Sequence, residues 1–127
     1  MESTGPRAIA TPMAESEEER ASIECEIERL TRELVELGAE RVILFGSRAR
    51  GTAVRGSDVD LLVVMPCPGE ESFPGRLARV AERLAPRTAV DLLVYTPEEF
   101  DRLRETRRFV RDAVLEGRVL HASRPDR

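Results

Sequence analysis

The feature that most constrains this chain is the pair Gly46-Ser47, followed shortly afterwards by two aspartates, Asp58 and Asp60. An apolar run of strand length ends at Gly46, and a second such run begins at Asp58. Because side chains alternate along a strand, Asp58 and Asp60 are expected on one face, roughly 7 Å apart. Two carboxylates placed in this way beside a Gly-Ser turn suit a site for Mg²⁺ and a triphosphate.

A third aspartate, Asp91, stands in the middle of another apolar run, residues 88–95. A single carboxylate inside a buried strand is costly unless it is paired or bound to a metal. If this strand lies beside residues 58–64, Asp91 can face the same site, and three carboxylates could then hold two divalent ions. The alternative for Asp91 is an ion pair with one of the many arginines of the chain.

The Gly-Ser pair suits contact with phosphate. Gly46 has no side chain, so backbone can approach a phosphate closely, and the hydroxyl of Ser47 can hydrogen-bond a β- or γ-phosphate oxygen. Arg48 is the arginine nearest to the turn, and arginine binds phosphate in a bidentate manner. The alternative is an ordinary turn between a strand and a helix.

Helix signals separate the three apolar runs. Ser16 begins an amphipathic helix of about twenty residues with a capping box, and Gly38 is suited to end it. Further helices are expected over residues 47–53, from 73 to near 86, from 96, and over about 105–116, with a short edge strand at 119–120.

The resulting order of elements predicts an α/β (α+β) fold, a small mixed β-sheet with helices on one face. One domain is expected over residues 16–121, between a flexible N-terminal extension, 1–15, and a flexible tail, 122–127. No internal repeat and no second domain are apparent.

Three segments together resemble a known family. They are Gly-Ser-Arg-Ala-Arg-Gly at 46–51, Ser-Asp-Val-Asp-Leu at 57–61 and Val-Asp-Leu at 90–92. At this spacing they resemble the nucleotidyltransferase superfamily of DNA polymerase beta. The chain looks most like the minimal nucleotidyltransferases, short prokaryotic proteins that keep only the catalytic domain. The resemblance covers about residues 22–121.

The resemblance implies a Mg²⁺-dependent transfer of NMP, here AMP from ATP, to a hydroxyl, with two Mg²⁺ ions at the site. Asp91 would be the third metal ligand and the base for the acceptor hydroxyl, and Ser57 would hold the loop or touch the nucleotide. The site residues so implied are Asp58, Asp60 and Asp91 for metal and catalysis, and Gly46, Ser47, Arg48 and Ser57 for the nucleotide.

The resemblance also implies a partner. Minimal nucleotidyltransferases often serve as antitoxins, paired in a hetero-oligomer with a small helical protein of the HEPN ribonuclease type that they can adenylylate. Two alternatives stay open: a binding module that neutralises such a partner by contact alone, and a nucleotidyltransferase for a small molecule such as an aminoglycoside. A homo-oligomer that builds a pocket would favour the latter.

Charge and hydropathy reduce the number of functional classes that fit the chain. The net charge of −4 argues against a general nucleic-acid binder. No apolar run approaches the length that spans a membrane, and no signal-peptide segment is apparent, so the expected compartment is the cytoplasm. The two cysteines, Cys25 and Cys67, lack metal-ligand spacing and are expected to be free thiols.

Overall fold

The computed structural model describes residues 13–123, and the predicted extension and tail outside this range lie beyond the described residues. The elements are α1 (Glu17–Glu36), β1 (Arg41–Phe45), α2 (Ser47–Arg50), β2 (Val59–Val64), α3 (Phe73–Leu84), β3 (Val90–Tyr95), α4 (Pro97–Thr106), α5 (Arg108–Glu116) and β4 (Arg118–Ala122). The predicted α/β class with a small mixed sheet is confirmed.

The sheet has the strand order β3-β2-β1-β4. β1 runs antiparallel to both of its neighbours, and β2 and β3 run parallel. A parallel pair needs a long crossover connection, which α3 provides here. The parallel register places Asp60 directly beside Asp91.

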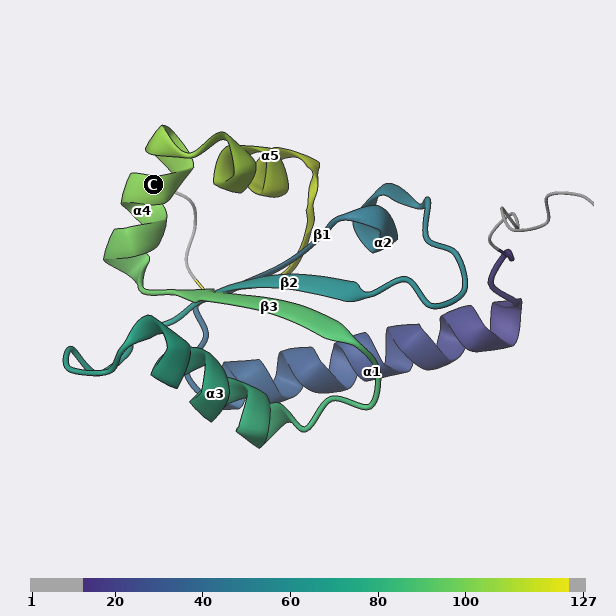
Figure 1. Cartoon of the computed structure of the whole chain (residues 1–127), viewed down its shortest axis with the longest axis horizontal. Coiled ribbons are helices and arrows are strands. Elements are labelled where there is room, and N and C mark those ends of the chain that lie inside the picture. Colours follow the sequence, from purple (N-terminus) through teal and green to yellow (C-terminus); the bar gives the residue numbers. More distant parts are fainter. Residues whose placement is uncertain (1–12, 124–127) are drawn as a thin grey trace, which may run out of the picture.

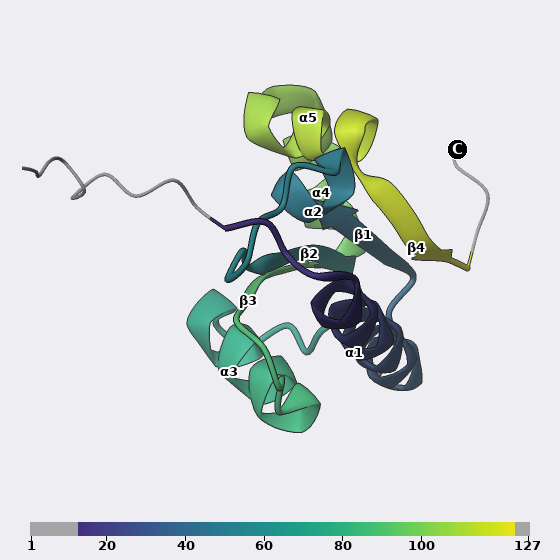
Figure 2. The same ribbon diagram turned by 90° about the vertical axis from the view of Figure 1, so that its right-hand side faces the viewer.

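Helices cover both faces of the sheet (Figures 1 and 2), so the expectation of helices on one face was wrong. α1 and α3 lie below the sheet, where Leu30, Val63 and Val80 belong to one buried cluster. α4 and α5 lie above it, where Phe100 and Val110 pack with others in a second cluster. The apolar side chains of the last two helices therefore cover part of the face that also carries the aspartates.

Local sequence explains why α1 forms where it does. Ser16 accepts a hydrogen bond from the Glu19 amide at 3.0 Å, and the Glu19 carboxylate accepts one from the Ser16 amide at 2.8 Å. This capping box was expected from the sequence. Ile27, Leu30 and Leu34 follow at helical spacing and are all buried, so they anchor α1 to the sheet.

Several element boundaries differ from the sequence-based expectation. β2 begins at Val59, so Asp58 precedes the strand, and β3 begins at Val90. β3 is an edge strand, and Asp91 is exposed rather than enclosed in a buried strand. The expected helix over 105–116 is divided at Arg107, whose extended backbone ends α4 and precedes α5.

The described segment also extends beyond the expected domain limits. Glu15, placed by sequence in a flexible extension, is buried, and Ala122 ends β4. The Ser123 amide donates to the Glu40 carbonyl at 2.8 Å. Over residues 13–123, no helix has the length and apolar character needed to cross a membrane.

A buried carboxylate ties α1 to the connection between α3 and β3. Glu26 accepts hydrogen bonds from Arg29 at 2.8 and 2.9 Å and from the Arg87 amide at 2.7 Å. Arg29 also donates to the Ala85 carbonyl at 3.2 Å. The hydrogen bonds from Arg29, and less strongly the one from Arg87, lower the pKa of Glu26.

The lowered pKa predicts a pH-dependent contribution of Glu26 to stability. Glu26→Gln should lower the free energy of unfolding by about 1.5 kcal/mol at pH 7, because charge-assisted hydrogen bonds are lost. The contribution is complete above the ordinary glutamate pKa of 4.5. It is lost as the pH falls through the lower folded-state pKa, where wild-type Glu26 becomes neutral like glutamine.

Urea unfolding of both chains between pH 3 and pH 7 measures this difference. Glu28→Gln, an exposed change on the same helix, is the matched control and should have an effect below about 0.5 kcal/mol. A difference between wild type and Glu26→Gln that does not shrink toward pH 3 would contradict the assignment.

Candidate active site

The Gly-Ser turn lies at the end of β1 and requires glycine for two reasons. Gly46 has φ 75° and ψ −158°, a backbone conformation that other residues rarely adopt. A Cβ at this position would also collide with Oδ2 of Asp60 and would lie 3.1 Å from its carboxyl carbon. The absence of a side chain at Gly46 therefore makes room for the Asp60 carboxylate directly against the turn.

Asp60 and Asp91 form a close pair of like charges. They lie side by side on parallel strands, close enough for their carboxyl groups to share a hydrogen when one of them is protonated. Burial raises the pKa of Asp60 to about 6, assisted by the negative charge of Asp91 and, more weakly, by that of Asp58. Two carboxylates that repel each other in this way favour a shared proton or a bound cation.

Asp58 stands apart from this pair. It is exposed on the loop before β2, and it acts on Asp60 through its charge. Over residues 13–123, no three His, Cys, Asp or Glu side chains are already arranged as a metal site. The structure thus joins Asp60 with Asp91 and leaves Asp58 at the rim. The donor chemistry fits Mg²⁺, which is commonly bound through one or two carboxylates together with substrate phosphates.

A pocket of about 380 Å³ adjoins Gly46 and Asp60. From the side of the Gly-Ser turn, Arg50 lines it, and from α5 the lining residues include Phe109, Asp112 and Glu116. The ring of Phe109 meets that of Phe45 edge to face, at 5.6 Å between centroids. A phosphate chain at the Gly-Ser turn would have this space beside it.

Arg50 is the arginine that faces the carboxylates. Its positive charge opposes the rise in the pKa of Asp60, and its side chain lines the pocket. The sequence-based choice was Arg48 instead. Residues three apart lie on one side of a helix, whereas adjacent residues point about 100° apart. Counting three residues from Ser47 along α2 would have selected Arg50.

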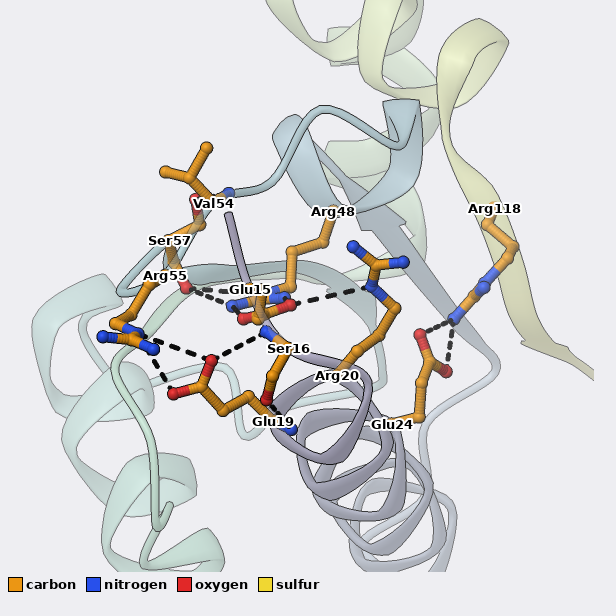
Figure 3. A network of polar contacts seen from close by, with 10 residues as sticks. All are labelled: Glu15, Ser16, Glu19, Arg20, Glu24, Arg48, Val54, Arg55, Ser57 and Arg118. Carbon is orange, nitrogen blue, oxygen red and sulfur yellow. Dashed lines mark hydrogen bonds and ion pairs between the residues drawn. The ribbon is translucent and has the colours of Figure 1, made fainter. Parts of the chain in front are cut away.

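The side chain of Arg48 is buried and points toward Glu15 (Figure 3), and it does not line the pocket. Its two Nη atoms donate to the Glu15 carboxylate at 2.8 and 2.7 Å. Nη2 and Nε also donate to the Ser57 carbonyl, at 2.9 and 3.3 Å. These contacts occupy the guanidinium group, so this geometry leaves Arg48 no free edge for a phosphate. No sequence pattern had linked Arg48 to Glu15.

Ser57 shapes the loop before Asp58. Its hydroxyl accepts a hydrogen bond from the Val54 amide at 2.9 Å, and its own amide donates to the Val54 carbonyl at 2.9 Å. Of the two roles considered from sequence, the structure shows the one in the loop. Contact of Ser57 with a nucleotide stays a prediction.

The candidate site thus combines a small mixed sheet, a Gly-Ser turn and paired strand carboxylates. A model of the nucleotidyltransferase domain family matches residues 24–121, and the chain belongs to this family. This agrees with the resemblance seen in the sequence motifs.

Solved structures that are similar to the chain include the following two. One is a crystal structure from Sulfolobus solfataricus described as a candidate nucleotidyltransferase. It is 30% identical and has a TM-score of 0.50, over 76% of this chain and 83% of that one. The other is a toxin-antitoxin structure with AMP-PNP, 23% identical with a TM-score of 0.48, over 75% of this chain and 73% of that one. No curated protein matches the chain.

The paired carboxylates predict a measurable effect of Asp91 on Asp60. In metal-free protein, Asp91→Asn should move the pKa of Asp60 downward from about 6, because the neighbouring negative charge is removed while burial remains. Carboxyl-carbon NMR titration measures the shift. Asp101→Asn, an exposed change on α4, is the control and should leave the Asp60 titration unchanged. An unchanged Asp60 titration in Asp91→Asn would show that the two groups do not interact.

Proposed function

We propose that the chain is a Mg²⁺-dependent nucleotidyltransferase that transfers AMP from ATP to a hydroxyl group. The observation that carries the proposal is the Asp60–Asp91 pair, held against the Gly46-Ser47 turn in a member of the nucleotidyltransferase domain family. The site offers closely spaced carboxylates for cations and a turn with a nearby arginine for phosphates.

In the proposed reaction each residue has a defined task. Ser47 donates its hydroxyl hydrogen to a terminal phosphate oxygen, and the Arg50 guanidinium group neutralises phosphate charge. Two Mg²⁺ ions, held by Asp58, Asp60 and Asp91, would supply charge neutralisation at the α-phosphate and the leaving pyrophosphate. Asp58 would join this pair as a ligand from the rim of the site.

Asp91 is placed to serve the acceptor. It is exposed on the edge strand, so a hydroxyl of another molecule can reach its carboxylate without passing through the sheet. Asp91 takes the proton of this hydroxyl as the oxygen forms a bond to the α-phosphorus. The bond between the α-phosphorus and the bridging oxygen breaks, and pyrophosphate leaves with that oxygen.

The acceptor we propose is a protein, a small helical partner of HEPN type, with the chain acting as an antitoxin in the cytoplasm. The resemblance to minimal nucleotidyltransferases supports this choice. The net charge of −4 also disfavours a nucleic-acid acceptor.

Neutralisation by contact alone is the second candidate. Three large apolar side chains of α5 and β4 are exposed: Phe109 by 56%, Leu115 by 75% and Val119 by 54%. Such side chains are suited to a protein contact. In this case inhibition of the partner would persist after both Asp58 and Asp60 are replaced.

Transfer of label from α-labelled ATP into proteins of the source cell's lysate tests the enzyme. Asp60→Asn should lower Mg²⁺-dependent labelling by at least about 10²–10³-fold, since a carboxylate at the reacting phosphate is lost. Asp101→Asn, the exposed change on α4, should label as the wild type does. Full labelling by Asp60→Asn would rule out the proposed mechanism.

The placement of Arg50 gives a second expectation. Arg50→Gln should raise the KM for ATP about tenfold, because one charge-assisted hydrogen bond to phosphate is lost. Arg55→Gln is the control, since Arg55 pairs with Glu19 on the surface and does not line the pocket. Steady-state kinetics compare the two variants, and equal KM values for ATP would remove Arg50 from the phosphate site.

A further inference from the structure

A buried ion pair connects the N-terminal segment to the loop that carries Asp58. The side chains of Glu15 and Arg48 are exposed by only 3% and 6%. Glu15 directly precedes Ser16, the N-cap of α1, so the capping box fixes where its side chain emerges. Figure 3 shows Glu15 between the first turn of α1 and the guanidinium group of Arg48.

Arg48 also contacts the loop that leads into Asp58. The group that pairs with Glu15 also donates to the Ser57 carbonyl, at 2.9 Å from Nη2. That carbonyl belongs to the peptide unit between Ser57 and Asp58. The guanidinium group of Arg48, a residue of α2, therefore joins the residue before the N-cap of α1 to the peptide unit that leads into Asp58.

A backbone hydrogen bond also joins the N-terminal segment to the loop before Asp58. The Arg55 amide donates to the Met13 carbonyl at 3.0 Å, so the loop is also hydrogen-bonded to the segment before Glu15. The surrounding pair of Arg55 and Glu19 is far more exposed, at 53% and 40% of their side chains. Exposed pairs hold geometry weakly, so the buried pair has the larger share in fixing the loop.

The chemistry of arginine makes the contact depend on Glu15. A guanidinium group stays charged under all ordinary conditions, so a buried Arg48 without its carboxylate cannot become neutral. It would have to turn toward water, and its hydrogen bonds to the Ser57 carbonyl would then be lost. The loop before Asp58 would keep the Ser57–Val54 turn and lose its attachment to α2.

We propose that Glu15 and Arg48 are positioning residues that hold the Ser57–Asp58 loop so that the Asp58 carboxylate can join Asp60 and Asp91 around a divalent cation. The inference rests on the proposed function, since it assigns Asp58 to the cation site. In this proposal the exposed Asp58 is held at the rim of the site, and the buried Arg48 supports the loop rather than binding phosphate.

The chain contains a matched control for this proposal. Glu26 with Arg29 is another buried carboxylate with a bidentate arginine, but it supports the segment before β3 rather than the active-site loop. Glu15→Gln and Glu26→Gln each remove one such charge. A general loss of stability would affect both variants in the same way, whereas loss of loop position is expected only in Glu15→Gln.

Two measurements on the full chain separate these cases. The first is titration with Mn²⁺ alone, followed by the EPR signal of free Mn²⁺, because Mn²⁺ accepts the carboxylate ligands that suit Mg²⁺. The second is amide hydrogen exchange at residues 57–59 without metal. Glu15→Gln should weaken Mn²⁺ binding about tenfold, as loss of an outer-shell support does. It should also speed exchange at residues 57–59, and Glu26→Gln should change neither quantity.

The outcomes are distinct. Mn²⁺ binding and exchange that Glu15→Gln leaves unchanged would overturn the inference alone, as would equal weakening of Mn²⁺ binding by Glu26→Gln. A wild-type chain that binds no Mn²⁺ would overturn the proposed function and the inference with it. If Glu15→Gln does not fold, Glu15→Asp replaces it, since the charge is kept and the shorter side chain can no longer reach both Nη atoms in the same position.

Discussion

The repulsion between two neighbouring carboxylates is the interaction on which the site depends. The parallel register of β2 and β3 forces Asp60 to lie beside Asp91, and burial raises the cost of two charges there. A fold selected for stability alone would place apolar or oppositely charged residues at such positions. The repulsion is reduced because β3 is an edge strand, where the Asp91 carboxylate is exposed to water.

Apolar burial in the rest of the fold offsets the unfavourable energy of this carboxylate pair. α1 and α3 pack against one face of the sheet, and α4 and α5 cover the far part of the other. The aspartates occupy the remaining part, next to the turn where Gly46 leaves room for the Asp60 carboxylate. The helix-covered part of the domain is thus separate from the part that carries the proposed active site, although both use the same four strands.

Local signals in the sequence predicted much of this arrangement. The capping box at Ser16, the apolar spacing of α1 and the strands around the aspartates depend on neighbouring residues, and all were found. The cover on both faces depends on how the last two helices turn at Arg107, which no local pattern indicates. The partner of Arg48 lies 33 positions away at Glu15, and a contact of that range leaves no periodic trace in the sequence. Arg50, by contrast, could have been found from helical spacing alone.

Because the loop before Asp58 is attached to Glu15, the limits of the family match differ from the limits of the segment that supports the site. The family match begins at residue 24, so a chain trimmed to the matched region would keep every aspartate of the site. It would lack Glu15 and the first turns of α1, and with them the anchor of the guanidinium group beneath the loop. The shortest segment that contains all three aspartates is therefore shorter than the shortest segment that also supports the loop before Asp58. Tags, fusions or truncations near Glu15 would accordingly affect the site without touching an aspartate.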